Sequence, residues 1–292
     1  MKRRRLDDEM IAQGICQTRD DALRMCMAGL VSCAGERFSS PAVRVEIGCD
    51  LHVKGRIPYV SRGGLKLSGA LDAFLVDAHD LYCLDIGCSS GGFTDCLLKR
   101  GARRVVSVDV GHAQFDWSLR NDERVDLHER TNIVDLPAQG FNSSFDLAVC
   151  DVSFTSIRTI LPATLELLAP HGAFVSLVKP QFEAQAHEVG EGGIVRDPKV
   201  HARVLAQTID LFAAHGLYPV DICASPIHGA KGNREFFIYG DRVRFNDSSS
   251  DDVRLQVSRL KEKTEDNGCF EPPSACGARP KNRAHLITPQ KR

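Results

Sequence analysis

Short apolar runs alternate with longer helical patterns from residue 81 to about residue 239. Between several of these runs lie stretches with helical spacing, notably 156–168 and 199–215. Alternating strands and helices are typical of βαβ units, so the pattern predicts an α/β fold with a mostly parallel, Rossmann-like sheet. The expected strands are 82–86, 104–108, 125–128, 145–150, 172–178, 217–224 and 235–239.

The first fifty residues predict a separate, smaller α/β unit. One helix is expected over 5–14 and a second over 18–29, and each ends at a glycine, the preferred helix stop. The second helix opens with a threonine and an acid three residues later, close to a capping box. Short strands are expected at 30–31 and 43–47, around a turn at Ala34-Gly35.

These patterns divide the chain into four segments. We expect a module over 3–55, a linker with a leading helix over 56–80 and the sheet domain over 81–242. Residues 243–292 contain serine, aspartate, proline and mixed-charge runs that offer little material for a core. We therefore predict a disordered tail there, with one short helix around 251–263.

The segment after the first strand of the sheet carries distinctive chemistry. It reads Asp85-Ile-Gly-Cys-Ser-Ser-Gly-Gly-Phe-Thr94 and precedes a helical stretch. Because glycine has no Cβ, the three glycines allow a sharp turn and let a ligand lie against the main chain. The dinucleotide fingerprint Gly-x-Gly-x-x-Gly is absent, which argues against a nucleotide-dependent dehydrogenase.

A second acid ends the next strand, in Val105-Val-Ser-Val-Asp109. An acid at each of these two strand ends suits S-adenosylmethionine. In this interpretation Asp85 faces the methionine ammonium group and Asp109 accepts both ribose hydroxyls. The alternative is a tight structural turn without a ligand.

Four more polar residues stand out by their places in the predicted fold. Asp151 and Lys179 follow strands, Glu235 leads into the last strand, and Lys66 lies in Val60-Ser-Arg-Gly-Gly-Leu-Lys66 before the sheet. Ligands of open α/β sheets bind at the carboxyl ends of the strands. We therefore expect the polar strand-end residues to lie on one edge.

The order Lys-Asp-Lys-Glu resembles the 2′-O-ribose methyltransferases of the FtsJ kind. The stretch from Val60 to Tyr239 resembles one family within that group, the TlyA haemolysin and rRNA methyltransferase family. The chain departs from the family pattern at Ser90 and at Asn132-Ile-Val. The motifs that carry the match are Arg62-Gly-Gly-Leu-Lys-Leu67, Asp85-Ile-Gly87, Gly91-Gly-Phe-Thr94, Val108-Asp-Val-Gly111, Asp151-Val-Ser-Phe154, Lys179-Pro-Gln-Phe-Glu183 and Gly193-Ile-Val-Arg-Asp197.

The N-terminal segment resembles the RNA-binding module of ribosomal small-subunit protein four, pseudouridine synthases and tyrosyl-tRNA synthetases. It does so through Arg5-Leu-Asp7, Thr18-Arg19, Ala22 and Ala28-Gly-Leu-Val31 with Ala34-Gly35. The family usually has asparagine where this chain has Ala34. The resemblance implies that Arg5, Arg19 and Arg24 hold the RNA backbone, and we expect Arg62 to contact RNA as well.

The resemblance implies S-adenosylmethionine-dependent 2′-O-methylation of cytidine in 16S and/or 23S ribosomal RNA. It implies action on ribosomal RNA or ribosomal subunits, with no stable protein partner. The scattered cysteines favour reduced thiols in a cytoplasmic protein, and we expect neither a metal nor a membrane partner. Asn132 and Asp135 both remain open as the adenine-side contact. The implied catalytic residues are Lys66, Asp151, Lys179 and Glu235, and the implied cofactor contacts are Asp85, Gly87, Ser89, Gly91, Gly92, Phe93, Asp109, Val110, Asn132 and Asp151.

A lysine base explains this set of residues in chemical terms. A ribose 2′-hydroxyl is a poor nucleophile, and a positioned base must take its proton. A free lysine is protonated at neutral pH, but burial and a second cation favour the neutral amine. We expect Lys66 to supply that cation to Lys179, Asp151 to orient both lysines, and Glu235 to hold the network and the ribose.

Charge and composition limit which classes of partner and site the chain can have. Residues 1–66 carry 12 Lys and Arg against 8 Asp and Glu, whereas the remaining residues carry 25 against 30. A basic N-terminal lobe indicates an anionic partner, with nucleic acid leading and a solvated charged face as the alternative. The eleven cysteines form no Cys-x-x-Cys pair, so neither a disulfide framework nor a zinc site is expected. We expect Trp117 to be a packing residue.

The haemolysin label of the resembling family supplies a second function class, a membrane-active protein. No apolar stretch approaches the ~18 residues of a membrane span. The charged start, Met1-Lys-Arg-Arg-Arg5, is followed by acids and not by the apolar region of a secretory signal. The sequence therefore favours the methyltransferase.

Overall fold

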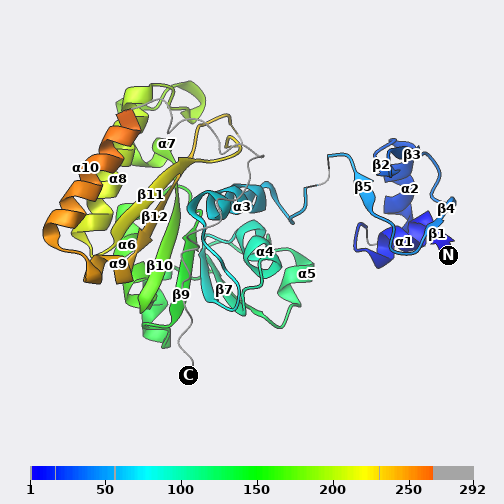
Figure 1. Cartoon of the computed structure of the whole chain (residues 1–292), viewed down its shortest axis with the longest axis horizontal. Coiled ribbons are helices and arrows are strands. Elements are labelled where there is room, and N and C mark those ends of the chain that lie inside the picture. The colour runs from blue at the N-terminus through cyan, green and yellow to red at the C-terminus, as the bar shows by residue number, and fades with distance from the viewer. Residues whose placement is uncertain (1, 17, 56, 230, 266–292) are drawn as a thin grey trace. The chain divides into compact units, whose positions relative to one another are not determined.

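The computed structural model describes residues 2–16, 18–55, 57–229 and 231–265 of the 292. The chain divides into two compact units, Met1–Ile57 and Pro58–Arg292. Figure 1 shows both, with the smaller unit in blue.

The larger unit is built on a seven-stranded sheet within the described residues, in the order β11-β12-β10-β9-β6-β7-β8. Neighbours from β10 to β8 pair in parallel, whereas β12 is antiparallel to both β10 and β11. The prediction of a mostly parallel α/β sheet is confirmed, and each of the seven predicted runs forms a strand. The strands are β6 (Tyr82–Ile86), β7 (Arg104–Asp109), β8 (Val125–Glu129), β9 (Phe145–Cys150), β10 (Leu168–Val178), β11 (Tyr218–Ala224) and β12 (Phe236–Asp241).

The strand order changes direction at β6. The chain goes from β6 outward to β7 and β8, then returns to place β9 on the other side of β6. A ligand crevice forms where the order reverses, outside the carboxyl ends of the strands. This topology puts the turn after β6 and the loop after β9 side by side.

Helices cover both faces of this sheet (Figure 1). The α-helices are α3 (Arg62–Phe74), α4 (Gly92–Lys99), α5 (Trp117–Arg120), α6 (Ile157–Leu167), α7 (Pro180–Glu183), α8 (Pro198–Ala214), α9 (Arg242–Asp247) and α10 (Ser250–Glu265). Short 3-10 helices span Ile133–Asp135, Pro137–Gln139, Ala186–Glu188 and Glu191–Gly193.

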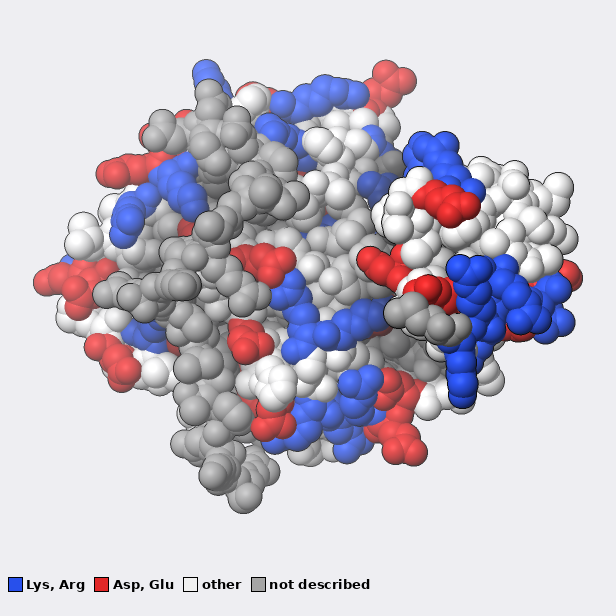
Figure 2. All heavy atoms as spheres, turned by 45° about the vertical axis from the view of Figure 1, so that its right-hand side comes forward, with Lys and Arg blue, Asp and Glu red and all other residues white. Residues whose placement is uncertain are grey.

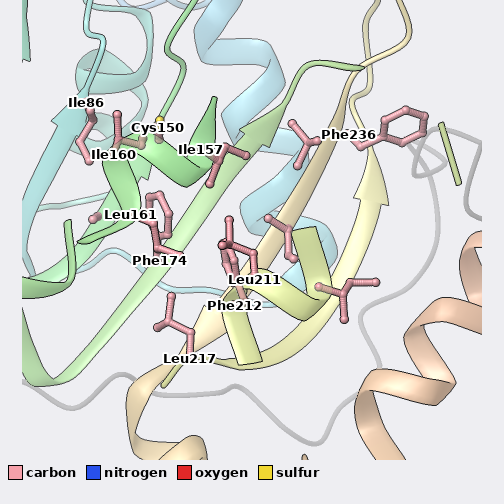
Figure 3. Close-up of a cluster of buried hydrophobic side chains, with 14 of the residues drawn as sticks. Ile86, Cys150, Ile157, Ile160, Leu161, Phe174, Leu211, Phe212, Leu217 and Phe236 are labelled. Atoms are coloured by element: carbon pink, nitrogen blue, oxygen red, sulfur yellow. The ribbon is translucent and has the colours of Figure 1, made fainter. Parts of the chain in front are cut away.

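Two buried clusters form the core, one on each face of the sheet. On one face Leu71 of α3 and Leu97 of α4 share a buried cluster with Val175 of β10. On the other face (Figure 3) Phe174 of β10 lies against α8, with its ring 5.6 Å from that of Phe212. Burial of each such side chain contributes about 1.5–3 kcal/mol. Burial on both faces explains why the central strands read as continuous apolar runs.

The smaller unit packs two helices against short strands. Its elements are β1 (Arg3–Arg5), α1 (Leu6–Ala12), α2 (Arg19–Met27), β2 (Val31–Cys33), β3 (Glu36–Phe38), β4 (Arg44–Glu46) and β5 (Leu51–Val53). The Thr18 side chain caps α2 by accepting a hydrogen bond from the backbone N–H of Asp21, as its position before an acid predicted.

The strand pairing of the smaller unit differs from the prediction. The strand predicted at 43–47 pairs with β1, and the Ala34-Gly35 turn joins β2 to β3 instead. Both turn residues have positive φ, of +48° and +85°, as a tight hairpin turn requires. The sequence did not reveal β3 because two of its three residues are charged and exposed.

The chain remains helical beyond residue 243, where we predicted disorder. Helices α9 and α10 span most of 242–265, so that prediction is wrong for 243–265, whereas the helix predicted around 251–263 is present. Val257 and Leu260 are three residues apart, and both pack against the core cluster that includes residues of α8. Lys263 Nζ donates to Asp221 Oδ1 at 2.6 Å. Residues 266–292 of the predicted tail lie outside the described residues.

Candidate active site

Glycines let the turn after β6 lie close to two other segments. Gly87 has a φ of +80°, and a Cβ there would lie 3.0 Å from the carbonyl oxygen of Asp151. A Cβ at Gly92 would lie 2.1 Å from Ser61 Oγ at the start of α3. A Cβ at Gly91 would meet a leucine of α5 at 2.5 Å. Both glycines therefore permit close packing of protein against the turn, and Gly92 also lines the second cavity described below.

A cavity of about 500 Å³ lies at the carboxyl ends of β6, β7, β8 and β9. Asp135, one of the two candidates for the adenine side, is not among its lining residues. Asn132 lines it, beside the apolar side chains of Ile133 and Val134. The predicted cofactor contacts that line this cavity are Gly87, Ser89, Asp109, Val110, Asn132 and Asp151.

Asp109 presents its carboxylate to this cavity from the end of β7. Its Oδ2 accepts the backbone N–H of Ser89 at 2.7 Å, and its Oδ1 accepts that of Gly111 at 2.7 Å. Each oxygen of a carboxylate accepts up to two hydrogen bonds. The two backbone donors therefore fix the carboxylate and leave capacity for hydroxyl groups of a ligand.

Asp85 lies beneath the turn and does not line the cavities described here. The residue is fully buried, and Thr94 Oγ1 donates to its Oδ2 at 2.6 Å. Its Oδ1 has no hydrogen-bond partner among the described residues. Desolvation raises the pKa of this carboxyl to about 7. The structure therefore places Asp85 behind the turn and away from these cavities, whereas we had expected it to face the methionine ammonium group.

A second cavity, of about 220 Å³, shares four residues with the first, namely Gly87, Ser89, Asp151 and Ser153. The start of α3 forms one wall, and the side chains of Lys66 and Lys179 also line it. Lysine side chains and a helix N-terminus together favour an anionic group. Its remaining lining residues are Ser61, Arg62, Gly63, Cys88, Ser90, Gly92, Phe93 and His228.

A third cavity, of about 470 Å³, brings together all four residues of the predicted catalytic set. Lys66, Asp151, Lys179 and Glu235 line it, and the first three also line the second cavity. They come from α3, the loop after β9, the end of β10 and the residue before β12. Residues 66 and 235 lie far apart in the chain and meet here.

Two ion pairs organise these four side chains. Lys66 Nζ lies 2.6 Å from Glu235 Oε2, and the two side chains are 12% and 4% exposed. Lys179 Nζ lies 2.6 Å from Asp151 Oδ1 and donates to Ser153 Oγ at 2.8 Å. The prediction that Asp151 orients both lysines needs correction, because the carboxylate paired with Lys66 is that of Glu235.

The sequence analysis missed three residues at this site. Ser153 bonds Lys179, and Phe154 lines both the first and the third cavity. Phe154 is 92% exposed with a φ of +63°, and its ring centre lies 5.2 Å from that of Phe182. Ser153 and Phe154 follow Asp151, and Phe182 follows Lys179. Their closeness in the sequence to these predicted catalytic residues was the signal that could have identified them. The packing role predicted for Trp117 is wrong, because its side chain is 73% exposed.

The four arginines predicted to bind RNA have partners within their own units. In the smaller unit Arg5 pairs with Asp7, Arg19 with Asp8 and Arg24 with Asp21, although 44–74% of each arginine side chain is exposed. Arg62 Nη2 donates to the carbonyl oxygen of His228 at 3.2 Å. The pairs of Arg19 and Arg24 are exposed on both sides and contribute about 0–1 kcal/mol, whereas the Asp7 side chain paired with Arg5 is only 3% exposed.

The family model of the FtsJ-like methyltransferases matches residues 59–242. The chain belongs to this family. It is 46% identical over 240 residues to YqxC of Bacillus subtilis, covering 82% of this chain and 85% of that protein. It is 41% identical over 240 residues to the 16S/23S rRNA (cytidine-2′-O)-methyltransferase TlyA of Mycobacterium tuberculosis, covering 82% and 90%. The predicted resemblance is confirmed.

A solved structure from Streptococcus thermophilus extends this likeness to the fold. It is 37% identical, with a TM-score of 0.61, and the match covers 91% of this chain and 99% of that one. The residues that line the three cavities all lie between Ser61 and Glu235, inside the family match. The cavities therefore belong to the methyltransferase part of the chain.

Proposed function

We propose that this methyltransferase transfers the methyl group of S-adenosylmethionine to the ribose 2′-oxygen of cytidine in 16S and/or 23S ribosomal RNA. The observation that carries the proposal is the arrangement of Lys66, Asp151, Lys179 and Glu235 around one cavity, next to the cavity at the strand ends. Two amines and two carboxylates at such a place suit proton removal from a hydroxyl. The name of the Mycobacterium tuberculosis relative supports the same substrate.

The first two cavities suit S-adenosylmethionine. Asp109 would accept the ribose hydroxyls of the cofactor, and Val110, Ile133 and Val134 would pack against its adenine. The methionine carboxylate would lie at the start of α3, where backbone N–H groups and nearby cations favour an anion. When bound, the cofactor supplies an electrophilic methyl group on a sulfonium.

Lys179 is the proposed base for the 2′-hydroxyl proton, which it can accept only as the neutral amine. Asp151 and Ser153 fix the direction of its Nζ, and the side chain is 9% exposed. A base in this position contributes about 10²–10⁴-fold to the rate. The Lys66–Glu235 pair lines the same cavity, where it would hold the ribose in place. No acid is needed for the leaving group, since the sulfur departs as a neutral thioether.

The smaller unit is the proposed RNA-holding part of the chain. Its arginines are exposed, and Figure 2 shows Lys and Arg gathered in groups on the visible face of the molecule, with Asp and Glu among them. Phosphate contacts release counterions, so the affinity for ribosomal RNA is expected to fall steeply with salt. In the full chain, Arg5→Gln and Arg19→Gln should each lower the slope of log K against log salt by about 1. A slope that neither variant changes would contradict the assignment of these arginines.

Mapping of ribose methylation tests the proposed function. Purified protein, S-adenosylmethionine with a labelled methyl group and unmodified 16S and 23S ribosomal RNA should give labelled 2′-O-methylcytidine, identified by mass spectrometry of the nucleosides. Ribosomal subunits offered in parallel distinguish free RNA from an assembled particle as substrate. Label on a base, or on no nucleoside of either substrate, would exclude the proposal.

The membrane-active alternative gains no support from the fold. No helix in the described part of the chain has the length and apolar character to cross a bilayer. A liposome leakage assay with the same protein preparation compares the two function classes directly. Dye release at the concentrations that support methyl transfer would favour the alternative.

A further inference from the structure

The 151–157 segment and the 179–183 segment contact each other at both of their ends. At one end Lys179 contacts Asp151 and Ser153. Four residues further along, Glu183 accepts two hydrogen bonds from the end of the same loop. Ser156 Oγ donates to its Oε2 at 2.6 Å, and the backbone N–H of Ile157 donates to its Oε1 at 2.8 Å.

The second bridge lies at the start of α6. Ser156 is the N-cap of this helix and Ile157 its first residue. The first N–H groups of a helix have no intrahelical partner, and a carboxylate there is favoured by the helix dipole. Glu183 therefore ties α6 to α7 and its neighbour Lys179. Desolvation raises the pKa of Glu183, as expected for a carboxyl group away from bulk water.

The loop between the two bridges holds a strained residue. Phe154 has a φ of +63°, a conformation that costs a residue with a bulky side chain about 1–3 kcal/mol. Its side chain is 92% exposed, so packing of its own ring does little to hold that conformation. Strain of this kind persists only where the surroundings enforce it. The contacts of Asp151 at one end and of Glu183 at the other supply that constraint.

We propose that Glu183 is a positioning residue, which holds the 151–157 segment in register with Lys179. This inference deepens the proposed function and rests on it for the role of Lys179. Loss of the Glu183 contacts would free the loop, so that Asp151 and Ser153 no longer fix the direction of Lys179 Nζ. Thr159 and Ile160, which line the first cavity, lie within α6. Because they are part of a helix, we expect them to move less than the loop.

Glu183→Ala and Glu183→Gln in the full chain test the inference. A glutamine can accept from the Ile157 N–H through Oε1 and donate to Ser156 Oγ through Nε2, whereas alanine does neither. We expect Glu183→Ala to lower kcat at least tenfold with little change in the KM for S-adenosylmethionine, and Glu183→Gln to restore most of it. Ser156→Ala removes one of the two bonds to Glu183 together with the cap bond from the Arg158 N–H, so its kcat should fall at least part of the way toward that of Glu183→Ala.

Amide hydrogen exchange of the 151–157 peptide supplies a readout that needs no RNA. Exchange should be faster in Glu183→Ala than in the wild type and close to wild type in Glu183→Gln. Faster exchange supports the positioning role even if the wild type fails to methylate RNA, a failure that would count against the proposed function alone. Unchanged exchange in Glu183→Ala, or a Glu183→Gln variant as impaired as the alanine variant, overturns the inference.

Discussion

Replacement of Lys179 by alanine is expected to abolish methyl transfer while S-adenosylmethionine binds with nearly unchanged affinity. Lys179 Nζ is held by Asp151 and Ser153 on the wall of the third cavity, where the acceptor hydroxyl would lie. It does not line the 500 Å³ cavity proposed for the adenosine half of the cofactor, and in the second cavity Lys66 and the start of α3 remain for the methionine carboxylate. Loss of the base should lower kcat by about 10²–10⁴-fold. Single-turnover transfer to ribosomal RNA and calorimetric titration with the cofactor measure the two quantities separately.

Two further variants sharpen this test. Lys179→Arg keeps a positive charge near Asp151, but a guanidinium does not give up its proton, so it should be as inactive as alanine. Lys199 is exposed at the start of α8 and does not line the active-site cavities, so Lys199→Ala should retain full activity. Turnover by the arginine variant at the wild-type rate would show that Lys179 provides charge and not a base.

The sequence predicted much of the fold because the strands of the sheet are buried on both faces. Such strands appear as apolar runs, and the polar residues that follow them must lie at the strand ends. Asp109, Asp151 and Lys179 were placed on one edge by this reasoning, and each lines at least one of the three cavities. The glycine turn was recognised for the same reason, since it directly follows the first strand.

The partners of these residues depend on strand direction, which the apolar pattern does not reveal. Because β12 is antiparallel to β10, its first residue, Phe236, pairs with the last residue of β10, Val178. Glu235 and Lys179 flank this pair and therefore reach the same edge. A parallel β12 would have carried Glu235 to the opposite edge, away from Lys66. The ion pair between Lys66 and Glu235 thus follows from a reversal that the sequence analysis did not predict.

The packing of helix α10 on the domain was hard to predict for a different reason, although a helix around 251–263 was expected. Charged and polar residues dominate the segment, and few apolar positions offer a helical stripe. Leu260 becomes buried, and Val257 partly buried, only because they pack against the core that includes residues of α8. Tertiary contact decides the structure of such a segment, and composition alone favoured disorder.

Replacement of Glu235 by alanine is expected to have the largest effect on stability among these variants. Lys66 is only 12% exposed and lies 2.6 Å from the Glu235 carboxylate. Removal of one partner of a buried ion pair leaves an uncompensated charge and costs about 3–5 kcal/mol. The free energy of unfolding, measured by urea denaturation, should fall by this amount. A loss below about 1 kcal/mol would mean that water reaches Lys66 as it reaches an exposed lysine.

The double variant Lys66→Met with Glu235→Leu separates the structural role of the pair from its proposed chemical role. Apolar residues of similar volume often replace a buried ion pair without loss of stability, so urea denaturation should return close to wild type. Methyl transfer should nevertheless be lost, because the cavity would keep Lys179 and Asp151 but lose the groups proposed to hold the ribose. If the stable double variant transferred methyl groups at the wild-type rate, Lys66 and Glu235 would have no part in the reaction. Catalysis would then rest on Lys179 and Asp151 alone.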